Sequence, residues 1–172
     1  RLDEHMQRLS ELQRKLGTTA SCGSVAVPGK DSGSVRGSDY SVNPAAQAEY
    51  WHLFADVLVA AFTCNTSRIG VLNVPDTFST FAGDWHQDVA HKCALAAQQK
   101  TLAAAHQRFF ENVFLDLVNK LDVDDGTGRS MLDDTLVAWS QESGNYTHEG
   151  QSIPIVTAGG AGGALTTGSY CD

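Results

Sequence analysis

Basic residues are scarce in this chain, and long apolar runs are absent. The 172 residues include 12 Lys and Arg against 20 Asp and Glu, which gives a formal net charge of -8 at pH 7. An acidic chain without a cluster of Lys or Arg is a poor match for nucleic acid or an anionic membrane. The longest apolar run, VLVAAF at 57–62, is far shorter than the roughly 20 residues that span a bilayer. We therefore expect neither nucleic-acid binding nor a transmembrane segment.

Cysteine is also sparse, and its spacing excludes two common kinds of site. Cys22, Cys64, Cys93 and Cys171 stand too far apart for a zinc ribbon or a redox CxxC motif. Four isolated cysteines allow two disulfides in three connectivities, or they are ordinary small core residues. The small polar residues around the first and last of them favour an exported protein.

Helical periodicity covers three stretches of the chain. Apolar residues recur at steps of three and four over 2–16, where Gly17 is a plausible C-terminal cap. A second helix is predicted to begin at Asn43 and Pro44, a typical N-cap and first-turn pair. Its expected buried face consists of Phe54, Val57, Leu58, Ala61 and Phe62. A third helix is predicted over about 94–121. Between the first two, Gly- and Ser-rich residues 18–42 indicate a long surface loop or insertion.

Short apolar runs bounded by turns predict three buried strands, RIGVLNV at 68–74, TLVAW at 135–139 and IPIVTA at 153–158. Pro154 has no amide hydrogen to donate to a neighbouring strand, so the last strand should begin there or lie at an edge of the sheet. Helix followed by buried strand favours an α/β fold. Since the chain opens on Arg1 within a helix, we expect residues 1–172 to be one α/β domain or the C-terminal fragment of a larger one.

The first polar cluster lies in FAGDWHQDVAH at 81–91, which supplies Asp84, His86, Asp88 and His91. Carboxylates and imidazoles are the ligands of zinc and related divalent ions. The alternative is that Asp84 caps the third helix, while the histidines are solvated or bonded to backbone.

A second polar cluster, SQESGNYTHEG at 140–150, follows the predicted strand at 135–139. If that strand is parallel to the one at 68–74, both polar loops open on the same edge of the sheet. The four residues that would then hold a divalent metal, zinc or calcium, are Asp84, His86, Glu142 and His148. His91 is a possible further ligand.

Three other features have simpler interpretations. His106 lies on the apolar stripe of the third helix, which predicts a core histidine with a satisfied hydrogen bond. The acidic stretch at 122–134 has its Gly one position too early for an EF-hand, so it is expected to be a tight turn between helix and strand. The glycines at 158–168 are expected to let backbone pass close to a site or a neighbouring element.

Four segments together resemble a known family: LDEHMQRLSELQRKL, LFADVLVAAFTCNTSRIGVLNV, DDGTGRSMLDDTLVAW and HEGQSIPIVTAGGAGGALTTG. Over most of its length the chain is similar to the C-terminal part of the bacterial HXXSHH-motif proteins. That family of unknown function is related to the alkaline phosphatase and sulfatase superfamily. The resemblance implies an exported protein with a missing N-terminal half. It also implies an alkaline phosphatase-like α/β fold, a three-layer, mostly parallel sheet flanked by helices.

The signature motif would fall at HQDVAH, where His86 and His91 match its first and last histidines. Val89 and Ala90 stand in place of the Ser and the middle His. By rough position, the resemblance also implies metal ligands at Asp84, His86 and His148, and an acidic site residue at Glu142.

Two functions follow as hypotheses. The favoured one is an exported or envelope-associated structural or binding component with a degraded hydrolase-like site. Its partner would be the missing N-terminal part or other protein chains, since a fold does not fix a function. The alternative is a metal-dependent hydrolase of phosphate or sulfate esters, with its nucleophile in the missing N-terminal part.

Overall fold

The computed structural model describes residues 39–170 except 125, 145 and 147. The predicted helix at 2–16, most of the predicted loop at 18–42, Cys22 and Cys171 lie outside the described residues. The extent of the domain beyond them stays a prediction.

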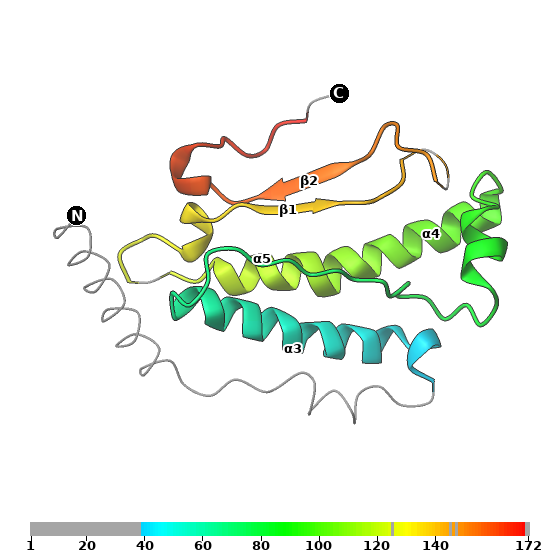
Figure 1. Cartoon of the computed structure of the whole chain (residues 1–172), viewed down its shortest axis with the longest axis horizontal. Helices are drawn as coiled ribbons and strands as arrows, with labels where there is room; N and C mark the ends of the chain where they lie inside the picture. The colour runs from blue at the N-terminus through cyan, green and yellow to red at the C-terminus, as the bar shows by residue number, and fades with distance from the viewer. Residues whose placement is uncertain (1–38, 125, 145, 147, 171–172) are drawn as a thin grey trace, which may run out of the picture.

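Two helical rods form the main layer (Figure 1). After the short 3-10 helix η1 (Tyr40–Val42) comes α3 (Pro44–Thr63), which packs against the second rod. The second rod consists of α4 (Ala96–Phe109), the π turn η3 (Phe110–Phe114) and α5 (Leu115–Leu121) in succession. The predicted second and third helices are thus confirmed.

The start of α3 follows its predicted cap. The side chain of Asn43 accepts a hydrogen bond from the Ala46 amide at 3.2 Å, and Pro44 fills the first turn. The predicted buried face is confirmed in part. Phe54 is half-buried and packs against Trp51, with ring centroids 5.3 Å apart, on the inward side of the helix. Its buried residues are Gln47, Ala48, Trp51 and Ala55. Val57, by contrast, is 39% exposed.

Lys120 joins α3 to α5. Its Nζ lies 2.6 Å from Asp56 Oδ1 and 2.8 Å from Asp116 Oδ2, and it donates to the carbonyl of His52 at 3.3 Å. Burial alone would lower the pKa of Lys120, but the hydrogen bonds and charges of the two aspartates outweigh burial and raise it. The cation therefore helps to fix the register of the two helices.

The core cluster gathers Trp51, Phe78 and Val113. Phe78 is 1% exposed and has a φ of 49°, which is costly for a non-glycine residue. Its amide donates to Gln47 Oε1 at 2.8 Å, and its carbonyl accepts from Arg108 Nη1 at 3.0 Å. Gln47 Nε2 also donates to the carbonyl of Tyr40 at 3.0 Å. A buried glutamine on α3 and a half-buried arginine on α4 therefore hold this strained residue in place.

The predicted three-layer, mostly parallel α/β sheet with an alkaline phosphatase-like fold was wrong. The described residues contain one two-stranded antiparallel sheet, made of β1 (Val137–Ser140) and β2 (Ile155–Ala158), in which Val137 pairs with Ala158 and Ser140 with Ile155. Parallel neighbours need a crossover, usually a helix. Only a loop joins these two strands, so the chain folds back on itself. Pro154 directly precedes β2, as predicted.

The segment at 68–74 is not a strand; it is extended without ladder partners and runs along the helices (Figure 1). Leu72 and Val74 pack against the core cluster. Ile69 and Val71 are 82% and 85% exposed, so the predicted burial of both faces was wrong. One face of the segment is covered by the helices and the other is open.

The acidic stretch after α5 is the predicted turn between helix and strand. Asp124 Oδ1 accepts from the amides of Gly126 and Gly128, at 2.7 and 3.1 Å. The 3-10 helix η4 (Met131–Asp134) follows, with a capping box between Ser130 and Asp133.

The glycines after β2 lead into the 3-10 helix η5 (Ala161–Gly163), which packs against η4. A Cβ on Gly159 would lie 2.2 Å from the carbonyl oxygen of Thr135. The amide of Gly160 donates to the carbonyl of Leu132 at 3.1 Å. These contacts confirm the predicted close approach of backbone.

Candidate metal centre and its cleft

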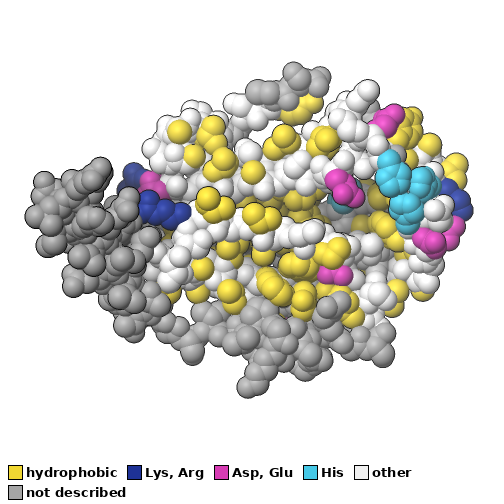
Figure 2. All heavy atoms as spheres, viewed as in Figure 1, with side chains coloured by type: hydrophobic (Ala, Val, Ile, Leu, Met, Phe, Trp, Pro, Cys, Tyr) yellow, Lys and Arg dark blue, Asp and Glu magenta, His cyan; other side chains and the backbone are white. Residues whose placement is uncertain are grey.

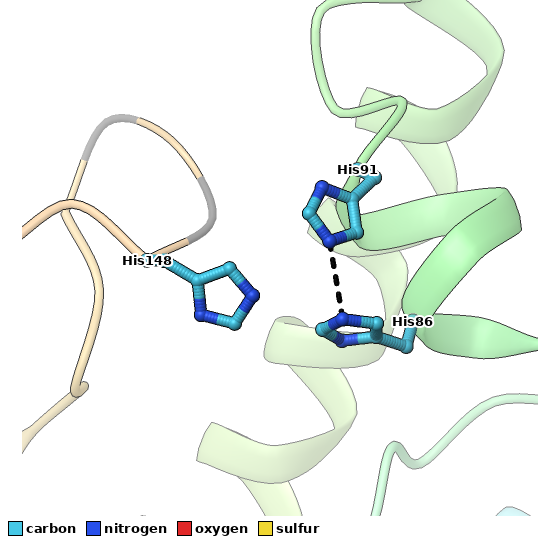
Figure 3. A group of neighbouring side chains, drawn as sticks. All are labelled: His86, His91 and His148. Atoms are coloured by element: carbon cyan, nitrogen blue, oxygen red, sulfur yellow. Dashed lines mark hydrogen bonds between the residues drawn. The ribbon is translucent and has the colours of Figure 1, made fainter.

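Three histidines converge at one end of the molecule. The ligand atoms that His86, His91 and His148 offer all lie within 4.8 Å of one another, and all three side chains are exposed (Figures 2 and 3). The Nε2 atoms of His86 and His91 are 3.1 Å apart. The ring of His148 lies 5.3 Å from that of His86 and 5.4 Å from that of His91, between centroids. Such a group can bind a metal ion.

A π turn places the first two histidines side by side. In an α-helix, residues five positions apart point about 140° away from each other. The segment η2 (His86–Ala90) is instead a π-helical turn, closed by a 3.0 Å hydrogen bond from the His91 amide to the His86 carbonyl. Because that bond stacks residue i+5 above residue i, both rings face the same side. Single π turns occur frequently at functional sites.

The loop between β1 and β2 carries the third histidine. His148 has a φ of 67°, and its amide donates to Ser143 Oγ at 3.1 Å. A backbone hydrogen bond also closes the loop, from the Gly144 amide to the Glu149 carbonyl at 2.8 Å. The two polar loops therefore meet, but through an antiparallel hairpin rather than a parallel sheet edge.

The predicted carboxylate ligands lie outside this group of three. Asp84 is exposed, and its Oδ1 accepts a 3.0 Å hydrogen bond from the amide of Gln87 in the π turn. The alternative that Asp84 caps the third helix was wrong, because α4 begins at Ala96. Glu142 is exposed and lines the same cleft as His86 and His148. Ligation by Asp84 and Glu142 stays a prediction. His91, a possible ligand in the sequence, belongs to the group.

A cleft of about 750 Å³ opens beside the histidines. Its walls come from the extended residues 72–78, from α4 and from the residues at and after the end of β1, and His86 and His148 line it too. Phe109 and Trp139 give it an aromatic wall, with ring centroids 5.8 Å apart. Among the described lining residues, Asp76 and Glu142 are acidic and none is Lys or Arg.

His106 also lines this cleft. Its Nε2 lies 2.6 Å from Nε2 of Gln141, an amide nitrogen that can only donate, so the ring nitrogen accepts. Burial lowers the pKa of His106, which favours the neutral ring that this hydrogen bond needs. The predicted hydrogen bond is present, whereas the side chain lies at the cleft rather than deep in the core.

Sequence reasoning missed several cleft residues. Trp139 was assigned only to a strand, and Gln141 was not singled out. Cys93, which has a free thiol, lines the cleft as well. The helical spacing of His106 and Phe109 did place those two on one face, and that shared face was the available signal.

Comparisons of this chain with protein-family models, curated proteins and solved structures give no match. Among the described residues, none of the helices combines the length and apolarity that crossing a membrane requires.

Proposed function

We propose that this chain is a metal-binding component that holds a divalent ion, zinc by preference, with His86, His91 and His148. The observation that supports the proposal is the convergence of three imidazoles. Two nitrogens of a tetrahedral zinc site stand about 3.3 Å apart for bonds of about 2.0–2.1 Å. The 3.1 Å between the Nε2 atoms of His86 and His91 is close to that value.

The donor set favours zinc over calcium. Calcium takes six to eight oxygen ligands. The three residues of the group offer imidazole nitrogen, which suits zinc and its transition-metal neighbours. Calcium would need the carboxylates of Asp84 and Glu142, and the first of these already accepts the Gln87 amide.

We further propose that the protein is exported and that it is a binding component of the HXXSHH family. The alkaline phosphatase-like fold expected for that family does not support this part of the proposal. Cys64 is disulfide-bonded, which suits an oxidising compartment. The partner would be a preceding part of a longer chain or another protein.

Zinc titration of the purified full chain, by calorimetry and by competition with a chromophoric chelator, tests the site. One zinc per chain is expected. Replacing His91 or His148 by Ala should weaken binding by about 100-fold or more, since loss of an outer-shell partner alone costs 10–100-fold. His52→Ala is the matched control, because His52 lies on α3 outside the group. Zinc binding that survives both replacements in folded protein would refute the proposal.

Two further variants separate capping from ligation. Asp84→Asn keeps an oxygen that can accept the Gln87 amide, so zinc affinity should stay within about threefold. Glu142→Gln should behave alike. A 100-fold loss in either variant would instead establish the four-ligand site predicted from the sequence.

A metal-dependent hydrolase of phosphate or sulfate esters is the second candidate. Three protein ligands leave a fourth position for water, as in catalytic zinc sites. The ion would border the cleft, because His86 and His148 line it. Hydrolysis of p-nitrophenyl phosphate or sulfate by the zinc-loaded protein, abolished by His148→Ala, would favour this candidate over pure binding.

A further inference from the structure

The cleft adjoins the histidine group, so a molecule in the cleft can reach an ion held there. His86 and His148 belong both to the group and to the cleft lining. At about 750 Å³, the cleft has the size of pockets that hold small organic ligands. An ion held by the three histidines would therefore border the same space as the cleft walls.

One wall of the cleft is aromatic. Phe109 contacts Phe78 on one side and Trp139 on the other, with ring centroids 5.9 and 5.8 Å apart. Arg108 and Gln47 fix the backbone of Phe78, so this wall is built on restrained residues. An aromatic body would gain both apolar burial and edge-to-face contact here.

The charges of the cleft limit the ligand's head group. Asp76 Oδ2 accepts from the Tyr40 hydroxyl at 2.6 Å and from Trp51 Nε1 at 2.7 Å, so its carboxylate is fixed by two donors. Glu142 adds a second acidic group, and the described lining offers neither Lys nor Arg to balance a dianion. A doubly charged phosphate monoester or phosphonate head is therefore poorly matched beyond the ion itself.

We propose that the cleft and the histidine-bound ion together bind an aromatic ligand with a single metal-coordinating, monoanionic head, such as an aryl carboxylate or hydroxamate. This inference rests on the proposed metal function. The head would coordinate the ion and the ring would lie against Trp139 and Phe109.

Calorimetry of the zinc-loaded full chain with three probes tests the inference: benzohydroxamate, acetohydroxamate and phenylphosphonate. Benzohydroxamate should bind about tenfold or more tightly than acetohydroxamate, because only its ring reaches the aromatic wall. It should also bind more tightly than the dianionic phenylphosphonate. Equal affinity for the two hydroxamates, or tighter binding of phenylphosphonate, would overturn the inference.

Two variants of Trp139 locate the effect. Trp139→Ala should remove the preference for benzohydroxamate while zinc affinity stays unchanged, and Trp139→Phe should retain most of the preference. If Trp139→Ala does not fold, a retained preference in Trp139→Phe together with the wild-type probe series still decides the question. Failure to bind zinc would refute the proposed function as well, whereas zinc binding without ring preference would refute only this inference.

Discussion

At the residue scale, burial lowers the pKa of His106, and Gln141 donates a hydrogen bond to its ring. The folded protein therefore resists protonating it. As pH falls below the ordinary value of 6.5, the unfolded chain takes up a proton that the folded chain does not. Stability should decrease on acidification through that range, and the decrease should stop once the pH passes the folded pKa.

The test compares urea midpoints at pH 7.5 and 5.5, with a chelator present to remove metal, for the wild type and His106→Gln. The wild type should lose more stability between the two pH values than the variant. Between pH 7.5 and 8.5, where the ring is neutral in both states, the two proteins should respond alike. An identical acid response in both proteins would contradict the assignment.

The site residues show what sequence reasoning can reach at this scale. Residue type and proximity to turns nominated His86 and His148. His91 was only a possible ligand, because five-residue spacing in an ordinary helix points two side chains apart and nothing local announces the π turn. The hydrogen bond from the Gln87 amide to Asp84 was not predicted, because the sequence does not specify where that backbone amide lies.

At the element scale, Gly159 is the residue after β2, and it lies against the backbone at the end of η4. A Cβ there would lie 2.2 Å from the carbonyl oxygen of Thr135 and 2.8 Å from that of Leu132, at a φ of +94°. Gly163 has a similar φ of +87°, and a Cβ there meets nothing within 4 Å. Alanine at either position carries the strain of a positive φ, but only alanine at 159 also collides with neighbouring backbone.

We expect Gly159→Ala to reduce the free energy of unfolding by about 2 kcal/mol more than Gly163→Ala, since both carry the strain but only the first must displace backbone. Chemical denaturation of the two variants beside the wild type measures the difference. Equal losses would show that η4 and η5 separate at little cost.

Helices and strands were predictable to different degrees for a physical reason. The start of α3 depends on Asn43 and Pro44, and the long α4–α5 rod on apolar spacing, all of which are local. A strand needs a partner, and an apolar run such as 68–74 does not specify one. The number of strands and their direction therefore could not be obtained from the runs alone.

At the scale of the whole molecule, the cysteines allow a test of how much a disulfide stabilises the fold. Cys64 is disulfide-bonded and Cys93 is free. Reduction should lower the free energy of unfolding by about 2–4 kcal/mol, because the cross-link limits the unfolded chain. Thermal unfolding with and without dithiothreitol measures the loss, and Cys93→Ser should leave it unchanged. A melting temperature insensitive to reduction would count against the cross-link and weaken the case for export.

The histidine group also depends on the number of residues in one turn of the backbone. The turn that holds His86 and His91 contains one residue more than an α-helical turn. In a gene, that residue is a single codon. An in-frame deletion within 87–90 would restore ordinary helix and bring the two histidines four positions apart, while a substitution there would keep the turn length. The π turn is therefore gained or lost through the insertion or deletion of one residue. A comparison of related sequences that counts only substitutions would overlook such a change.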